Sequence, residues 1–490
     1  MKLTIFMPTM VLKLGTALHY RLYIIKERIG IVNHKCVESP NLIYVFADQL
    51  RFSSCGFAGN ARARTPNIDC LARESINFCN AVSGSPVCAP YRASVFTGKY
   101  SSSTGMVINE LRLNPNHKCF GHVLRDGGYN TAYIGKWHLW ANELGNHRDP
   151  KNAFAPPGLY RFGFDGYWAA YNFWHEYYTA RYYHDTPAPI SVEGYEPDVQ
   201  TNLAIEQLRR HRDSDKPFAL FLSYGTPHDP WNKENVPPQY YDMFRDVEFG
   251  FPPNYKPEND PYADPWARLN PAERAQLDEW QRVYYAMTAN LDWNVGRLLQ
   301  AVNDLGLRDH TICVFTSDHG EMFGAHGRRA KNIFYEEAIR VPFLLRYPGH
   351  HVPGQVSDVC LNTPDVMPTL LPLMGLSVPD TVEGMDLSHY ILGEAGPEPE
   401  AAYMQGMGCT AAWEDGYEWR ALRDKRYTYA IMYVDGAEFL FDNKNDPYQM
   451  VNLVDDKDKD HQSILQGFRD LLKQRMFELS TSATKMAKPG

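Results

Sequence analysis

Four short apolar runs along this chain end abruptly in polar residues. Residues 42–47 lead to Asp48, and residues 131–134, 218–222 and 311–315 show the same change. Uninterrupted apolar runs of this length are typical of strands buried on both faces, as in a parallel sheet that helices cover. The runs therefore predict an α/β fold built on a large, mostly parallel sheet.

Several segments between these runs have apolar residues at helical spacing. This spacing predicts helices over residues 67–78 and 271–299, and a further helix that opens at Thr363-Pro364-Asp365. Proline suits the first turn of a helix, where its missing N–H is not needed. This alternation predicts that helices flank the sheet.

The pattern changes after residue 375. Residues 419–423 and 427–431 flank a polar triplet, which predicts a hairpin, and residues 438–442 form another short strand. We therefore expect a smaller C-terminal antiparallel-sheet subdomain beside the main one.

A chain of 490 residues exceeds the roughly 250–300 residues at which a single core usually stops growing. We expect an N-terminal extension at 1–39, a main domain at 40–375 and a C-terminal α+β subdomain at 376–490. The extension starts with a basic and then an apolar stretch, so it is either a secretory signal peptide or a segment that is not native to the fold. A signal peptide would place the protein in the periplasm or outside the cell, and otherwise we expect it in the cytoplasm.

Net charge, hydropathy and cysteine spacing argue against three kinds of partner: nucleic acid, membrane and structural zinc. The net charge of −9 argues against a nucleic-acid binder, and no apolar run approaches the ~20 residues of a membrane span. The nine cysteines include no Cys-x-x-Cys pair, so we do not expect a structural zinc site. The sequence does not indicate an oligomeric state.

Polar side chains follow each of the predicted strands. Ligands of open α/β sheets bind beyond the carboxyl ends of the strands, so we expect these side chains to share one edge of the sheet. They are Asp48, Lys136, His138, His228, Asp318 and His319.

Asp48 and Asp318 are the candidates for a metal site. Two carboxylates that meet at one edge repel each other unless a cation lies between them. Oxygen ligands favour a hard ion, so we expect Ca²⁺, with Mg²⁺ as the alternative. Gln49 can add an amide oxygen, and His319 can add a nitrogen. Taken singly, an aspartate at a strand end also suits a helix cap.

Residues 88–98 read Cys-Ala-Pro-Tyr-Arg-Ala-Ser-Val-Phe-Thr-Gly. Pro90 predicts a helix start, which places Cys88 beside backbone N–H groups that favour an oxyanion. Arg92 would face the same way one turn later. The same surroundings would activate a plain thiolate, so a cysteine nucleophile and a buried structural cysteine are the alternatives.

Lys136 and Lys331 predict a cationic clamp for a tetrahedral anion, with solvated surface lysines as the alternative. His138 follows Lys136 by two residues, so on extended backbone the two side chains would point the same way. The ordinary pKa of histidine suits His228 for proton transfer to a leaving oxygen, and a structural loop histidine is the alternative.

Residues 160–183 are rich in Tyr, Phe and Trp. Such rings either line a sugar-binding cleft or pack in the core. His175 and Arg181 within this stretch are candidates to bind a carboxylate or the hydroxyls of a sugar.

Several segments together carry a resemblance to a known family. They are Thr65-Pro66-Asn67-Ile68-Asp69, residues 88–98, Gly135-Lys136-Trp137-His138-Leu139, Ser317-Asp318-His319-Gly320-Glu321 and Val341-Pro342-Phe343. They resemble the type I, formylglycine-dependent sulfatases of the alkaline-phosphatase-like superfamily. The resemblance implies that residues 40–375 form a sulfatase catalytic domain with sulfuric ester hydrolase activity.

The resemblance also assigns the nucleophile and the metal site. It implies that a formylglycine-generating enzyme oxidises Cys88 to formylglycine and that Arg92 stabilises the aldehyde hydrate. It implies that the Ca²⁺ ligands are Asp48, Gln49, Asp318 and His319.

By the same resemblance, Lys136 and Lys331 look like clamps on the sulfate group. His138 looks like the group that helps the hemiacetal to collapse, and His228 looks like the partner of the leaving group. In the implied mechanism one hydroxyl of the aldehyde hydrate attacks sulfur while the cation and the lysines neutralise charge. The second hydroxyl then expels sulfate and restores the aldehyde.

Three residues depart from the usual family pattern. Gln49 replaces a commoner aspartate, His319 stands where asparagine is often found, and Tyr91 replaces the usual serine. Gln49 removes one negative charge from the metal site, and Tyr91 is expected to slow the oxidation of Cys88.

The aromatic stretch points to a sulfated carbohydrate as the substrate, one that bears a uronic acid. Two other functions stay open at this point. One is a phosphonate monoester or phosphodiester hydrolase of the same superfamily, which shares the Asp-Gln start. The other is a non-catalytic glycan-binding relative, although the complete set of site residues argues against it.

Overall fold

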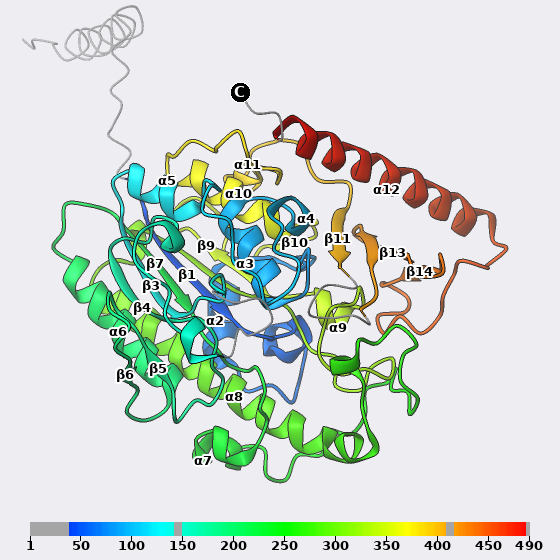
Figure 1. The fold of residues 1–490 in the computed structure, drawn as a ribbon, viewed down its shortest axis with the longest axis horizontal. Helices are drawn as coiled ribbons and strands as arrows, with labels where there is room; N and C mark the ends of the chain where they lie inside the picture. Colours follow the sequence, from blue (N-terminus) through cyan, green and yellow to red (C-terminus); the bar gives the residue numbers. More distant parts are fainter. Residues whose placement is uncertain (1–38, 142–148, 408–415, 487–490) are drawn as a thin grey trace, which may run out of the picture. The chain divides into compact units, whose positions relative to one another are not determined.

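The computed structural model describes residues 39–141, 149–407 and 416–486. Residues 40–490 form one compact unit, drawn as a ribbon in Figure 1. The extension predicted at 1–39 lies outside the described residues except for Ser39. Its nature and the cellular location inferred from it therefore stay predictions.

An eight-stranded sheet forms the centre of the compact unit, with the strand order β10-β2-β9-β8-β1-β7-β3-β4. Its strands are β1 (Asn41–Ala47), β2 (Ile76–Phe78), β3 (Asn130–Lys136), β4 (Tyr167–Tyr171), β7 (Phe218–Ser223), β8 (Thr311–Ser317), β9 (Phe343–Arg346) and β10 (Val356–Ser357). From β8 to β4 all neighbours are parallel, whereas β9 is antiparallel to both β8 and β2. The predicted large, mostly parallel sheet is confirmed.

Side chains of β1 alternate between the two faces of this sheet. Leu42, Tyr44 and Phe46 pack in one core cluster, and the residues between them pack in another. Helices α3 (Cys88–Thr97), α5 (Phe120–Asp126), α10 (Val366–Leu373) and α11 (Ser388–Ile391) contribute to the first cluster. Helices α2 (Pro66–Glu74), α6 (Glu196–His211), α7 (Pro238–Asp242) and α8 (Pro271–Asp304) contribute to the second. Figure 1 shows these two layers on either side of the sheet, which explains the uninterrupted apolar runs.

The helix predicted at 271–299 is confirmed, and α8 continues to Asp304. It starts with a capping box, in which Asn270 Oδ1 accepts a hydrogen bond from the N–H of Glu273 at 3.0 Å. In return, Glu273 Oε2 accepts from the N–H of Asn270 at 2.8 Å. This exchange satisfies N–H groups that a helix start otherwise leaves without a partner.

The helix predicted at 67–78 is wrong in its second part, because α2 ends at Glu74. Ile76 and Phe78 instead belong to strand β2, which pairs with β9 on one side and β10 on the other. Both side chains are buried in the sheet core, so pairing with distant strands outweighs the local helical spacing.

The C-terminal part contains a four-stranded antiparallel sheet in the order β11-β12-β13-β14. Its strands are β11 (Ala402–Gly406), β12 (Trp419–Arg423), β13 (Tyr427–Met432) and β14 (Glu438–Asp442). Helix α12 (Lys459–Met486) buries Leu465, Phe468 and Leu472 against this sheet. The predicted hairpin and subdomain sheet are confirmed, whereas the boundary at 375/376 stays a prediction.

Short elements complete the fold. They are α4 (Ser101–Thr104), α9 (Glu336–Ile339), β5 (Arg181–Tyr182), β6 (Ile190–Ser191) and the 3-10 helices η1 (Phe52–Ser54), η2 (Gly56–Ala58), η3 (Pro150–Asn152), η4 (Leu159–Arg161), η5 (Lys233–Asn235), η6 (Pro265–Ala267), η7 (Arg308–His310) and η8 (Thr363–Asp365). The helix predicted to open at Thr363 therefore begins as the 3-10 turn η8 and continues as α10. Within the described ranges, no helix is both long and apolar enough to cross a membrane.

The aromatic stretch at 160–183 is mostly core. Phe162, Phe164 and Trp168 are buried in the first core cluster. Phe173 and Trp174 are half-buried. Tyr160, Tyr167 and Tyr182 are also half-buried and pack against the core. Core packing therefore accounts for most of the rings, and Phe173 and Trp174 lie next to His175 in the chain.

Candidate active site

Strands β1 and β8 pair in parallel register up to their last residues, so the residues that follow them meet at one edge of the sheet. Asp48 follows β1 and Asp318 follows β8. Between them, the backbone N–H of Gln49 donates a hydrogen bond to Asp318 Oδ1 at 2.9 Å. The predicted meeting of the two aspartates is present in the structure.

Four side chains surround one point beyond these strands. One potential ligand atom each of Asp48, Cys88, Asp318 and His319 lies within 4.8 Å of the others, and all four residues are buried. His319 Nδ1 lies 3.0 Å from the carbonyl oxygen of Gly320, so it carries the proton and leaves Nε2 as an acceptor. That Nε2 atom lies 3.1 Å from Cys88 Sγ and 3.6 Å from Asp318 Oδ1.

Burial and mutual repulsion set the charge on the two aspartates. Burial, together with the charge of Asp48, raises the pKa of Asp318 to about 7. Burial raises the pKa of Asp48 as well, but the positive charges of Lys136 and Arg92 outweigh burial and hold this pKa well below its usual range. The protein groups alone therefore favour the protonated form of Asp318 far more than is usual for an aspartate. A hard divalent cation would hold both carboxylates ionised, so the donor set fits such an ion.

Cys88 is the first residue of α3, and Pro90 lies in the first turn, as predicted. The Cys88 thiol donates to Asp48 Oδ1 at 3.6 Å. Burial and the charge of Asp48 raise the pKa of this thiol to about 12. Without a bound cation, unmodified Cys88 is therefore protonated near neutral pH.

Arg92 lies behind the two aspartates. Its Nη2 is 3.3 Å from Asp318 Oδ2 and 3.5 Å from Asp48 Oδ2. Its Nη1 donates to the carbonyl oxygen of Lys136 and to Ser223 Oγ, each at 2.7 Å. The guanidinium group thus ties the ends of β1, β3, β7 and β8 together, and its predicted role toward the nucleophile stays a prediction.

Gly135 lets β3 approach β7 just before Lys136. Its φ is +101°, and a Cβ at this position would lie 2.0 Å from the carbonyl oxygen of Ser223. Lys136 then directs its ammonium group to Asp48, to which it donates a hydrogen bond. Its Nζ also lies 3.0 Å from His175 Nε2. Lys136 is thus fixed at the carboxylates, and its role as a clamp on an anion stays a prediction.

The extended backbone predicted through His138 is wrong, because φ is +55° at this residue and β3 ends at Lys136. The His138 ring lies against Phe173, with 4.9 Å between ring centroids. Lys136 Nζ lies 4.8 Å from the centroid of the same Phe173 ring. The two side chains therefore share a neighbour, which a turn rather than a strand brings about.

Lys331 reaches the cluster from the loop between β8 and α9. Its Nζ donates to Gln49 Oε1 at 2.7 Å and to His228 Nε2 at 2.9 Å. Lys136 and Lys331 are both buried and reach the cluster from two different parts of the chain. The alternative of solvated surface lysines is therefore excluded.

His175 and His228 stack on each other, with 3.9 Å between ring centroids. His175 Nε2 faces Lys136 Nζ, and His228 Nε2 faces Lys331 Nζ. An ammonium group has no acceptor, so each Nε2 accepts and each ring is neutral. Burial and the neighbouring lysine lower the pKa of His175 to about 3, and burial together with the charge of Lys331 lowers the pKa of His228 well below its usual range.

Arg181 is the predicted site residue that the structure does not bring to this cluster. It lies in β5, with its guanidinium over the ring of Trp174 at 4.6 Å. Among the described residues it makes no hydrogen bond or ion pair with the two lysines or the two stacked histidines. Its predicted contact with substrate stays a prediction.

Glu321 and Ser223 belong to the network but were not predicted as site residues. Glu321 Oε2 accepts from Gln49 Nε2 at 2.6 Å, and Ser223 accepts from Arg92. Both lie in segments that the apolar runs or the motifs marked. A single serine or glutamate carries no spacing signal, so only the packing of distant segments reveals its role.

Two models of known protein families match this chain. A family model described as Sulfatase matches residues 40–376, and one described as N-sulphoglucosamine sulphohydrolase, C-terminal, matches residues 324–480. The chain belongs to the sulfatase family. This sulfatase is 37% identical over 462 residues to the ulvan-active sulfatase of Formosa agariphila. The matched region covers 93% of this chain and 84% of the relative.

Two further relatives support the same assignment. An endo-4-O-sulfatase of Bacteroides thetaiotaomicron is 30% identical over 478 residues, with 86% of this sulfatase and 89% of the relative covered. A solved structure from Bacteroides fragilis matches with a TM-score of 0.78 at 31% identity, with 93% of this chain and 99% of that chain covered. The α/β fold of the alkaline-phosphatase-like type and the sulfuric ester hydrolase activity are confirmed, in preference to the phosphodiesterase and non-catalytic alternatives.

Proposed function

We propose that this sulfatase hydrolyses a sulfate ester on a sulfated carbohydrate that also bears a uronic acid. The observation that carries the proposal is the pair of buried lysines, Lys136 and Lys331, at a cluster of potential metal ligands. Two buried ammonium groups at one cluster suit a small, tetrahedral anionic group such as sulfate. The names of the relatives in Formosa and Bacteroides point to sulfated glycans as the larger substrate.

We infer that a formylglycine-generating enzyme converts Cys88 to formylglycine. An aldehyde hydrate at this position would supply the attacking oxygen, which the protonated thiol of Cys88 does not supply. The position favours this chemistry, because the N–H groups at the start of α3 stabilise negative charge on an oxygen at residue 88.

We also infer that the cation is Ca²⁺, held by the carboxylates of Asp48 and Asp318 and by His319 Nε2, and that it would act as a Lewis acid on the sulfate group. Gln49 Oε1 accepts from Lys331, but a carbonyl oxygen has a second lone pair that remains for the cation. Gln49 therefore suits the role of a fourth ligand.

The protein's own groups bind the sulfate and move a proton. Lys331 and Lys136 donate N–H groups to the sulfate oxygens, which keeps the ester in place. Neutral His228 holds its proton on Nδ1, which lies 2.9 Å from the carbonyl oxygen of Asp229. Its Nε2 can take a proton and return it to the leaving oxygen, because burial makes the charged ring a strong acid. The role of His138 in the final step stays a prediction.

The test is sulfate release after co-expression with a formylglycine-generating enzyme. We expect an intact mass that shows conversion of Cys88, and sulfate release from sulfated, uronate-containing oligosaccharides. Cys88→Ala, produced in the same way, is expected to release none. Activity restricted to small aryl or alkyl sulfates would contradict the carbohydrate proposal, and full activity of unmodified protein would contradict the formylglycine proposal.

A further inference from the structure

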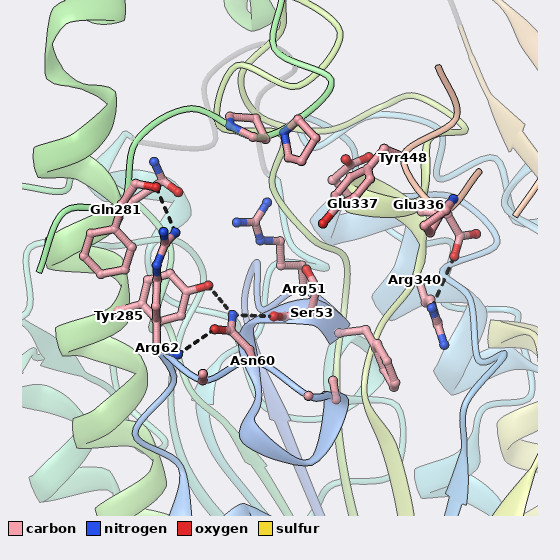
Figure 2. A pocket seen from close by; sticks show the side chains of 18 of the residues that line it. Arg51, Ser53, Asn60, Arg62, Gln281, Tyr285, Glu336, Glu337, Arg340 and Tyr448 are labelled. Carbon is pink, nitrogen blue, oxygen red and sulfur yellow. Dashed lines mark hydrogen bonds and ion pairs between the residues drawn. The ribbon is translucent and has the colours of Figure 1, made fainter. Parts of the chain in front are cut away.

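A cavity of about 520 Å³ lies between η1, α8, α9 and the loop that follows β14 (Figure 2). Its volume lies in the range of pockets that hold small ligands. None of the predicted catalytic, substrate-binding or metal-binding residues lines it. The cavity is therefore distinct from the catalytic cluster and unexplained by the catalytic function.

The lining of this cavity carries an excess of positive charge. Three arginines, Arg51, Arg62 and Arg340, face two glutamates, Glu336 and Glu337. Glu336 pairs with Arg340 inside the cavity, with 3.6 Å between Oε2 and Nη1 (Figure 2), and both of its carboxylate oxygens accept hydrogen bonds from Arg423 at 2.6 and 3.1 Å. Among the described residues, no carboxylate lies within 4.0 Å of the guanidinium nitrogens of Arg51 or Arg62.

The two arginines without a carboxylate partner have donors to spare. Arg62 Nη1 donates to the carbonyl oxygen of Phe249 at 2.8 Å, and Arg51 Nε donates to Ser54 Oγ at 3.1 Å. A guanidinium group has five N–H donors, so each of the two can form a paired hydrogen bond with an anion. Figure 2 shows the guanidinium groups of both residues within the cavity.

Polar and aromatic groups complete the lining. Glu337 Oε1 accepts from Asn254 at 2.7 Å, whereas its Oε2 is buried with no hydrogen-bond partner among the described residues. A sugar hydroxyl is a donor that would satisfy this oxygen. At the rim, Phe251 is 58% exposed and Tyr448 is 42% exposed, and such rings offer apolar faces to a sugar.

We propose that this cavity binds an anionic sugar residue, one that carries a carboxylate or a sulfate group, at a site separate from the catalytic cluster. The arginine pair binds the charged group, Glu337 accepts from a hydroxyl, and the exposed rings pack against the sugar. The inference goes beyond the proposed function because it assigns a second carbohydrate-binding site, one that does not take part in hydrolysis.

The test measures binding of three defined hexasaccharides to the full-length protein by isothermal titration calorimetry. Hyaluronan hexasaccharide carries carboxylates only, chondroitin 4-sulfate hexasaccharide carries both anionic groups, and maltohexaose carries neither.

Two variants change the lining of the cavity: Arg62→Gln removes one cation and Phe251→Ala removes one rim ring. Arg51 is kept, because its Nη1 reaches the carbonyl oxygen of Glu321 beside the catalytic network. The matched control is Arg212→Gln, an exposed arginine outside the cavity.

We expect Arg62→Gln to weaken binding of at least one anionic hexasaccharide on the order of tenfold, because the variant loses a charge-assisted hydrogen bond to the ligand. Phe251→Ala should weaken the same complex, and Arg212→Gln should not. Hydrolysis of 4-nitrophenyl sulfate should stay within twofold of the unchanged protein in all three variants, roughly the scatter of ordinary surface substitutions. Which anionic hexasaccharide responds then tells carboxylate recognition from sulfate recognition.

Three results would overturn the proposal: no binding of either anionic hexasaccharide, equal binding of maltohexaose, or unchanged binding in Arg62→Gln. The outcome is separable from that of the proposed function. Binding that depends on Arg62 in a protein that releases no sulfate would support the cavity and count against the catalytic proposal alone.

Discussion

The Nζ atom of Lys331 lies 2.7 Å from Gln49 Oε1, so this ammonium group meets a neutral amide rather than a carboxylate at the metal site. An aspartate is commoner at this position in the family, and its charge would pair with Lys331. With Gln49 in place, the positive charge of Lys331 is less neutralised by its neighbour and remains for an anionic substrate.

The first prediction concerns this charge. Lys331→Ala should lower kcat/KM for sulfate release on the order of 100-fold, because it removes a buried donor from the sulfate group. Initial rates with 4-nitrophenyl sulfate and with an oligosaccharide measure the effect. Lys216→Ala, which changes an exposed lysine, is the matched control and should be close to neutral. A Lys331→Ala enzyme with the full rate and an unchanged melting temperature would show that this lysine does not bind the sulfate.

The second prediction concerns the cation. After chelation, added Ca²⁺ should raise the melting temperature, because a ligand at 100 times its Kd stabilises the native state by about 2.7 kcal/mol. Asp318→Asn should reduce this rise, since it removes one of the two carboxylates at the cluster. Asp213→Asn, at an exposed aspartate, should respond like the unchanged protein. A larger rise with Mg²⁺ than with Ca²⁺ would contradict the proposed ion, and an equal response of Asp318→Asn would contradict the site.

The third prediction separates backbone strain from steric overlap at two glycines. Gly128 and Gly135 both have positive φ, at +85° and +101°. A Cβ at Gly128 meets no atom within 4 Å, whereas one at Gly135 would lie 2.0 Å from the carbonyl oxygen of Ser223. Gly128→Ala should therefore cost about 1 kcal/mol, and Gly135→Ala should cost about 1–3 kcal/mol more and also displace Lys136. Urea unfolding compares the two variants, and equal costs would count against the close contact of β3 and β7.

The ends of the parallel strands could be predicted from the sequence because burial on both faces leaves a mark in each strand by itself. The apolar run before Asp48 and the run before Asp318 each predict a strand, and the fold class requires their ends to share an edge. This local signal, with the family resemblance, accounts for the cluster formed by these aspartates with Cys88 and His319.

Features that depend on distant segments left no such mark. Ile76 and Phe78 have helical spacing in the chain, and only their pairing beside β9 and β10 makes them a strand. The turn at His138 and the stacking of His175 on His228 likewise depend on neighbours far away in sequence. The residues that line the arginine-containing cavity come from several separate segments of the chain, so no sequence motif predicts this cavity.

The fourth prediction is a pH dependence that originates at Asp292 on α8. Its Oδ1 accepts from the backbone N–H of Ile68 at 2.7 Å and its Oδ2 from Asn67 Nδ2 at 2.7 Å, so it caps the start of α2. Burial raises the pKa of Asp292 to about 6, whereas an aspartate in the unfolded chain has a pKa of about 3.9.

As the pH rises from about 4 to about 6, the unfolded chain therefore loses this proton before the native protein does. The contribution of Asp292 to the free energy of unfolding should fall over this range, by about 3 kcal/mol for a shift of roughly two units. Asp292→Asn has no charge to bury, so its stability should fall less steeply between pH 4 and pH 6, although it loses one acceptor at the helix start. Urea unfolding of both proteins at several pH values gives the two slopes. Parallel slopes would show that Asp292 titrates in the native protein as it does in the unfolded chain.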